Sequence, residues 1–204
     1  MLGVNFDSTK QSLQEILREI EQGKMQLPDF QRGWVWDDDR VKSLLASLSV
    51  SFPIGAVMTL ETGGDGIRFK PRPIEGTDPA TTQPEPDILI LDGQQRLTSL
   101  YQSLMSKQPV HTRDFKGKAI ERWYYIDMAA AVAEEADREE AVFSLSEDRI
   151  ERKFGGETGL DLSTPDHEYA NRCFPFSKIF ASAEWRQGYS KHWSYDTGKM
   201  QLFD

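Results

Sequence analysis

The sequence of 204 residues has one cysteine, Cys173, and no long apolar run. A single thiol cannot form a disulfide within the chain, which is typical of proteins of the reducing cytoplasm. No stretch approaches the roughly 20 consecutive apolar residues that a membrane-spanning helix needs. The first ten residues lack the basic region followed by an apolar one that marks a secretory signal. We therefore expect a cytoplasmic protein with no membrane association, in which Cys173 is a buried, inert thiol.

Several signatures of enzymes are also missing. The sequence contains neither a G-x-x-x-x-G-K-[ST] phosphate loop nor a G-x-G-x-x-G dinucleotide fingerprint. Its three histidines, His111, His167 and His192, are scattered and form no His-Asn-His nuclease motif. The formal net charge is -9. Because nonspecific DNA binding depends on clustered Lys and Arg, this charge argues weakly against a protein that coats DNA.

The residues that are present predict an α+β domain. Hydrophobic residues make up 38% of the chain, enough for a core. Apolar residues at helical spacing predict a helix capped by Ser8 and Gln11 and ended by Gly23, and a second helix capped by Asp37 or Asp38. Further helices are expected over 97–104, 129–141 and 183–193, and strands over 56–61, 87–91, 119–128 and 142–146. Residues 62–86, with five prolines and four glycines, predict a mobile hairpin or loop outside the core.

The stretch DILILDGQQR contains the clearest candidate site. A short strand leads directly into a polar turn and then into a helix. The first N–H groups of a helix lack intrahelical partners and lie at its positive end, so such a junction can bind an anion. Gly93 leaves room for a phosphate, because it has no side chain. Gln94 and Gln95 add amides, and Arg96 adds a planar fork of donors that matches phosphate oxygens.

Asp92 has two interpretations that the sequence leaves open. A carboxylate repels a phosphate unless a cation bridges them, so a functional Asp92 predicts a Mg²⁺ ion held between Asp92 and the phosphates. Alternatively, Asp92 and Gln95 have the spacing of a capping box and simply begin the helix. That alternative leaves Gln94 and Arg96 unexplained.

A second polar segment, DFQRGWVWDD, precedes the helix that Asp37 or Asp38 caps. Arg32 in this segment is either a second phosphate clamp opposite Arg96 or a surface residue paired with Asp29 or Asp37. The two tryptophans are expected to bury their rings in the core, although stacking on a nucleic-acid base is an alternative.

Two motifs together indicate a family. The segments LPDFQRGWVWDDDRVKSLLASLSVSFPIGAV and LDGQQRLTSLYQSL, with FPFSKIF later in the chain, resemble the DGQQR-motif family, domain of unknown function 262. This is the GmrS-like N-terminal domain of GmrSD-type modification-dependent restriction and phage-defence enzymes. The resemblance extends from residue 8 to about residue 190.

The resemblance implies a fold similar to the ParB and sulfiredoxin nucleotide-binding fold, with a small mixed sheet flanked by helices. It also implies a Mg²⁺-dependent NTPase in which Asp92 holds the metal. The implied catalytic residues are Asp92, Gln95 and Arg96. The implied nucleotide-binding residues are Gln31, Arg32, Gly93, Gln94 and Arg96.

We expect a single domain over residues 1–204, with a core at about 8–128 and a C-terminal extension at about 129–204. Since no nuclease motif is present, an HNH-type nuclease domain is expected in cis or in trans, and DNA contact is expected indirectly or through the full-length protein. The leading function is an NTP-binding and hydrolysing regulatory domain of a DNA restriction system. The alternatives are a ParB-like DNA-recognition module without NTP hydrolysis, and an interaction scaffold without a ligand.

Overall fold

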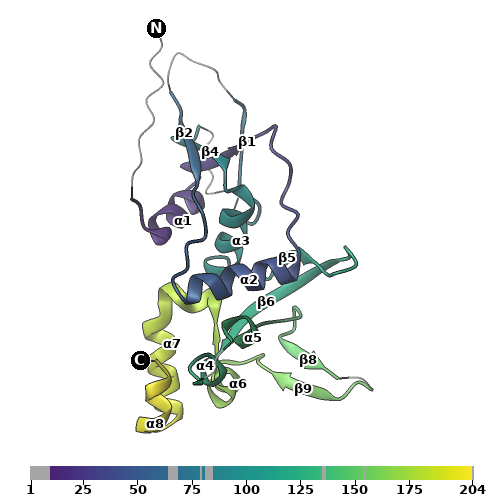
Figure 1. Ribbon diagram of the computed structural model, residues 1–204, viewed down its shortest axis with the longest axis vertical. Helices are drawn as coiled ribbons and strands as arrows, with labels where there is room; N and C mark the ends of the chain where they lie inside the picture. Colours follow the sequence, from purple (N-terminus) through teal and green to yellow (C-terminus); the bar gives the residue numbers. More distant parts are fainter. Residues whose placement is uncertain are drawn as a thin grey trace.

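The structure, a computed structural model, describes residues 10–63, 69–78, 80, 85–134, 137–153 and 155–203. The molecule is elongated, with a four-stranded sheet in each half and helices packed around both (Figure 1). A further two-stranded sheet, residues 150–152 and 158–161, lies in the half that contains the C-terminal helices. The predicted α+β class, with small sheets flanked by helices, is confirmed.

The first sheet carries the strand–helix junction. Its order is β2 (Met58–Glu61), β4 (Ile88–Asp92), β1 (Met25–Pro28) and β3 (Pro71–Arg72). β1 and β4 are parallel, whereas β2 and β3 are antiparallel to their neighbours. Helix α3 (Gln94–Leu104) follows β4 after one residue. The start of α3 therefore lies at the carboxyl end of an inner strand, where open sheets that contain parallel strands commonly bind ligands.

The first two helices begin at side-chain caps. α1 (Leu13–Glu21) has a capping box in which Ser12 Oγ accepts from Glu15 N and Glu15 Oε2 accepts from Ser12 N. The predicted cap at Ser8 lies outside the described residues, and the helix begins one turn later. Gly23 follows the end of α1 with φ +71°, as predicted. α2 (Asp38–Ser49) begins at Asp37, one of its two predicted caps.

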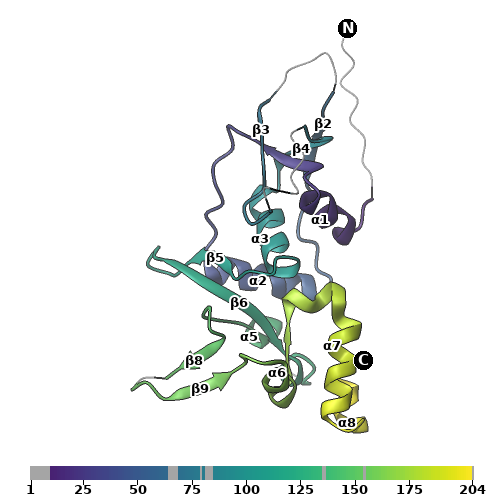
Figure 2. The same ribbon diagram turned by 180° about the vertical axis from the view of Figure 1, so that it is seen from behind.

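The second sheet is built on β6 (Ala119–Asp127), the longest strand. It pairs antiparallel with β5 (Val110–Arg113), β7 (Val142–Leu145) and β10 (Cys173–Pro175). Figure 2 shows the remaining strands and the C-terminal helices in the same half of the molecule as β6. These remaining elements are α4 (Met128–Ala131), α5 (Arg138–Ala141), β8 (Ile150–Arg152), β9 (Thr158–Asp161), α6 (Pro165–Asn171), η1 (Phe176–Ala181), α7 (Ser182–His192), α8 (Thr197–Met200) and η2 (Gln201–Phe203).

The prediction of a single helix over residues 129–141 is wrong. The segment forms two four-residue helices, because Asp127 and Asp137 each cap a new start. The segment also lacks the apolar stripe that would hold a longer helix against the core.

One hydrophobic cluster joins the two halves of the molecule. It contains buried residues of α1, β1, α2, β4 and α3, and it continues into Val110, Tyr124, Val142 and Phe176. The cluster thus includes residues on both sides of residue 128, and the expected single domain with a core and a C-terminal extension stays a prediction. Cys173 is buried beyond this cluster, as predicted, and burial raises the pKa of its thiol to about 12. No helix among the described residues combines the length and apolar composition needed to cross a bilayer.

The segment 62–86 contributes to the core, contrary to the prediction. Ile74 is only 2% exposed and belongs to the main cluster. Gln102 Nε2 of α3 also donates to Glu75 O at 3.0 Å, which fixes the turn after β3. Proline content alone was misleading here, because a single buried side chain and a two-residue strand anchor the segment. The parts of this segment at 64–68, 79 and 81–84 lie outside the described residues.

We expect Ile74→Val to lower the free energy of unfolding by about 1 kcal/mol, because it removes one buried methylene. Urea unfolding of the purified chain measures this. Ile179→Val is the matched control, since Ile179 is 38% exposed and its change should stay within about 0.5 kcal/mol. Equal effects at the two positions would mean that Ile74 is not in the core.

Candidate functional site

A cavity of about 410 Å³ opens where β4 meets α3, and we call it the junction cavity. Its volume lies within the roughly 300–1,000 Å³ of typical ligand pockets. All residues of the predicted site line it, together with Phe30, Trp36 and Leu91. The site residues are Gln31, Arg32, Asp92, Gly93, Gln94, Gln95 and Arg96. Two segments about 60 residues apart in sequence therefore form one concave site.

The start of α3 lines the cavity, although Gly93 and Gln94 are themselves buried. Gly93 is the N-cap residue with φ +90°, and no side chain accepts a hydrogen bond from the first turn. The capping box between Asp92 and Gln95 is therefore not formed. A Cβ at Gly93 would lie 3.1 Å from Val57 Cγ2, so both the backbone angle and the space favour glycine. The first N–H groups of this 11-residue helix lack intrahelical acceptors and receive no capping side chain from Gly93, which is the kind of helix start that binds anions.

Residues 31–35, which we call the strap, form neither a helix nor a strand, and the first two of them line the cavity. Gln31 attaches the beginning of the strap to β4, because its Nε2 donates to Ile90 O at 2.7 Å and to Leu91 O at 2.9 Å. This side chain thus satisfies carbonyl groups at the end of the strand.

Gln94 and Gln95 attach the rest of the strap to α3. Gln94 Nε2 donates to Arg32 O at 2.6 Å. Gln95 uses both ends of its amide: Nε2 donates to Gly33 O at 3.2 Å, and Oε1 accepts from Val35 N at 2.9 Å. In this structure the glutamine amides therefore hold the strap in place. Their direct contact with a nucleotide stays a prediction.

The Arg96 guanidinium also donates hydrogen bonds to backbone carbonyls. Its Nη1 donates to Ile54 O and its Nη2 to Ala56 O, both at 2.7 Å. Its Nη2 also lies 3.5 Å from Asp92 Oδ2. Gly55 has φ +96°, and a Cβ there would fall 1.8 Å from Arg96 Nη1. The F-P-I-G segment thus provides one carbonyl and the missing side chain that the guanidinium needs, and Ala56, the next residue, provides the second carbonyl.

Arg32 differs from Arg96, because its guanidinium is uncommitted: no described residue holds it in place. It is exposed and lines the cavity, and no hydrogen bond or ion pair of its guanidinium to another described residue is present. The alternative pairing with Asp29 or Asp37 is not observed; Asp37 caps α2 and lies 3.7 Å from Arg40.

Asp92 fits a metal ion only together with a phosphate ligand. Its side chain is 73% exposed at the cavity. The described residues contain no cluster of three or more His, Cys, Asp or Glu side chains that could hold a metal by themselves. Mg²⁺ is commonly bound by one or two carboxylates and by phosphate oxygens and water, so one exposed aspartate suits a magnesium ion that arrives with a nucleotide.

Two residues of the site were missed by the sequence analysis. Arg72 Nη2 donates to Arg32 O at 3.1 Å and to Gln31 O at 3.3 Å. Arg72 Nη1 lies 3.0 Å from Glu75 Oε1, which also accepts from Trp34 N at 3.1 Å. No local pattern marks these residues, because Arg72 ends a two-residue strand and Glu75 lies in the turn after it, inside a proline-rich segment.

The tryptophans of the strap region pack against the core, as expected. Trp34 and Trp36 are partly buried against the main cluster. Trp34 Nε1 donates to Ser99 Oγ at 2.9 Å, and Ser99 Oγ donates to Gln95 O at 2.7 Å.

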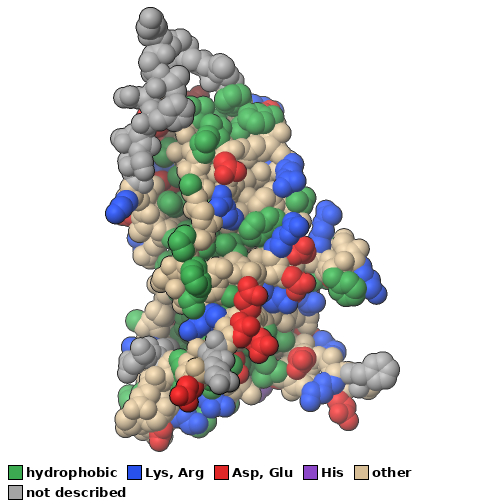
Figure 3. Space-filling model, in the orientation of Figure 1, with side chains coloured by type: hydrophobic (Ala, Val, Ile, Leu, Met, Phe, Trp, Pro, Cys, Tyr) green, Lys and Arg blue, Asp and Glu red, His purple; other side chains and the backbone are tan. Residues whose placement is uncertain are grey.

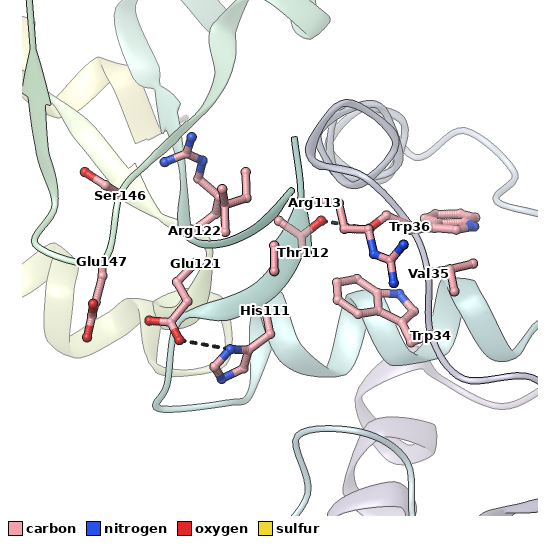
Figure 4. Close-up of a pocket in the computed structure, with 12 residues that line it drawn as sticks. Trp34, Val35, Trp36, His111, Thr112, Arg113, Glu121, Arg122, Ser146 and Glu147 are labelled. Atoms are coloured by element: carbon pink, nitrogen blue, oxygen red, sulfur yellow. Dashed lines mark hydrogen bonds and ion pairs between the residues drawn. The ribbon is translucent and has the colours of Figure 1, made fainter. Parts of the chain in front are cut away.

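A second and larger cavity, of about 600 Å³, lies beside Trp34, Val35 and Trp36 (Figure 4). Here His111 Nδ1 lies 3.0 Å from Glu121 Oε1. No residue of the DGQQR motif lines this cavity, and Trp36 lines both cavities. We assign the candidate site to the smaller cavity, because the uncapped helix start and the uncommitted arginine both lie there.

The charge on one face of the molecule bears on its partners. In Figure 3, acidic side chains gather over α2 and α5, with basic side chains interspersed. The described residues of this face form no continuous basic surface of the kind that binds DNA phosphates.

Comparison with known proteins identifies relatives of this chain. The family model described as GmrSD restriction endonuclease, N-terminal domain, matches residues 13–187. An uncharacterized protein of Methanocaldococcus jannaschii is 30% identical over 188 residues, which cover 90% of this chain and 31% of that protein. The chain thus spans about a third of the length of this relative. No solved structure matches the chain.

Proposed function

The chain belongs to the family of GmrSD restriction endonuclease N-terminal domains, and on that premise we propose that it is the NTP-binding regulatory domain of a modification-dependent DNA restriction system. In this proposal an HNH-type nuclease domain, in cis or in trans, cuts the DNA. Binding and hydrolysis of the nucleotide control that activity. The parallel β1–β4 pair, with α3 directly after β4, supports a ParB-like nucleotide-binding fold.

The observation that carries the proposal is the uncommitted Arg32 guanidinium at the same cavity as the uncapped start of α3. An anion bound there would meet the permanent positive charge of Arg32, the first N–H groups of α3 and the positive end of the helix dipole. Arg32 offers a planar fork that suits phosphate oxygens. A polyphosphate tail is the ligand that uses all of these groups together.

Hydrolysis is the second part of the proposal. Asp92 is the exposed carboxylate beside the proposed phosphate position, and a Mg²⁺ ion held there with the nucleotide would neutralise phosphate charge. Arg96 and Gln95 support this geometry through the backbone segments that they hold. Their direct action on the transferred phosphoryl group is part of the proposal.

The test is a thermal-shift panel of ATP, GTP, CTP and UTP, with and without Mg²⁺, followed by titration of the tightest binder and measurement of phosphate release. We expect Arg32→Ala to weaken binding by roughly 10–100-fold, since a hydrogen bond to a charged group contributes about 1.5–3 kcal/mol. Arg113→Ala is the matched control, because Arg113 is exposed and lines the other cavity. Its affinity should equal that of the wild type.

The absence of any shift with all four nucleotides, at millimolar concentration and with Mg²⁺, would contradict the proposal, because even weak binding stabilises a fold by mass action. In that case a gel shift with modified duplex DNA, weakening steeply with salt, would favour the DNA-recognition module instead.

A further inference from the structure

The strap depends on distant side chains for its backbone hydrogen bonds. Polar backbone groups outside helices and sheets need such partners. Five backbone groups of the strap receive them, from two sides. Gln94 and Gln95 of α3 hold one side, whereas Arg72 and Glu75 hold the other.

The two sides meet at Arg32. Its carbonyl accepts from Gln94 Nε2 at 2.6 Å and from Arg72 Nη2 at 3.1 Å. Arg72 is oriented in turn by Glu75, whose carboxylate lies 3.0 Å from Nη1. The backbone of Arg32 is therefore held between two donors, while its guanidinium has no partner among the described residues.

The Arg72–Glu75 pair is itself fixed by the fold. Gln102 Nε2 of α3 donates to Glu75 O at 3.0 Å. The next residue, Gly76, has φ +94°, and a Cβ there would lie 2.8 Å from Gln102 Cγ. Since Ile74 is buried in the core, the turn that carries Glu75 is anchored on both sides. The pair can thus transmit a fixed geometry to the strap.

We propose that Arg72 and Glu75 are positioning residues of the junction cavity, which act through the strap to present the Arg32 guanidinium to a triphosphate. This inference rests on the proposed nucleotide-binding function and adds two residues that lie outside both sequence motifs. The physical reason is preorganisation: an arginine on a fixed backbone loses less conformational freedom on binding than one on a mobile loop. Arg72 acts through Arg32 and does not touch the ligand.

The experiment measures the dissociation constants of the tightest-binding NTP and of inorganic tripolyphosphate, both with Mg²⁺. The proteins are the wild type, Arg32→Ala, Arg72→Ala and the double variant. We expect Arg72→Ala to weaken binding about tenfold in the wild-type background and to have no further effect once Arg32 is absent. A tenfold loss in both backgrounds would overturn the proposal, because Arg72 would then act independently of Arg32.

Two further variants separate positioning from charge and from folding. Arg72→Lys keeps the charge but not the fork that reaches Glu75 and two carbonyls, so binding should stay weakened severalfold; full recovery would overturn the proposal. Glu75→Gln keeps an acceptor for Trp34 N and removes the charge that orients Arg72. We expect Glu75→Gln to weaken binding severalfold, again only when Arg32 is present. If Arg72→Ala does not fold, Glu75→Gln takes its place in the experiment.

The outcomes distinguish this inference from the proposed function. If the wild type binds neither probe, the proposed function fails and the positioning role fails with it. If the wild type binds, Arg32→Ala weakens binding and folded Arg72→Ala does not, only the positioning role is wrong.

Discussion

Replacing Arg96 with alanine is expected to lower the free energy of unfolding by about 3 kcal/mol, because two carbonyls lose a charged donor at once. These carbonyls belong to Ile54 and Ala56, in the connection between α2 and β2. The Arg96 side chain is only 24% exposed, so water replaces the lost bonds incompletely. Urea unfolding followed by circular dichroism measures the change.

The control for Arg96 is Arg113→Ala, which removes an exposed arginine from the end of β5 and should change the unfolding free energy by less than about 0.5 kcal/mol. Arg96→Lys should recover only part of the loss, because one ammonium cannot match the two-armed contact. An unchanged denaturation midpoint in Arg96→Ala would show that Arg96 does not hold residues 54–56. The expected result also means that lost nucleotide binding in Arg96→Ala cannot by itself identify Arg96 as a ligand.

Gly55→Ala is expected to be the more damaging substitution, at about 4 kcal/mol. A non-glycine residue at φ +96° is strained by about 1–2 kcal/mol. The added Cβ would also lie 1.8 Å from Arg96 Nη1, so the guanidinium must leave its carbonyl partners. Urea unfolding of the single variants and of the double variant with Arg96→Ala measures both contributions.

In the Arg96→Ala background, Gly55→Ala should cost only the backbone strain, because the clashing group is gone. Gly117→Ala is the matched control for that strain: Gly117 has φ +79°, and a Cβ there would meet nothing within 4 Å. It should therefore cost about 1–2 kcal/mol. Full additivity of Gly55→Ala and Arg96→Ala would contradict the contact between these two residues.

Local patterns predicted the elements around the site. The apolar spacing of Leu97, Leu100, Tyr101 and Leu104 matches the buried face of α3. The same logic located α2 and its cap at Asp37. Hydrophobic periodicity and capping depend on neighbours within a few residues, so a single sequence contains the information they need.

Local patterns gave wrong predictions where a tertiary contact competes with a local preference. Asp92 and Gln95 have capping-box spacing, yet Gln95 bonds to the strap, and Asp92 is the last residue of β4. The alanine-rich run at 129–141 has helical propensity but no stripe to pack, and it forms two short helices. Propensity and spacing are weak preferences, which tertiary partners override.

The sequence by itself determined that a glycine-containing turn joins a strand to an amphipathic helix, and its two motifs predicted that their polar side chains belong to one site. Only the tertiary structure decided what each side chain does there. Gln94 reaches Arg32 across 62 residues and Arg96 reaches Ile54 across 42. Among the described residues the Arg32 guanidinium has no hydrogen-bond or ion-pair partner, and it lines the cavity. The physical reason is that a hydrogen bond requires its partners within about 3 Å, and for distant residues that distance is set by packing of the core.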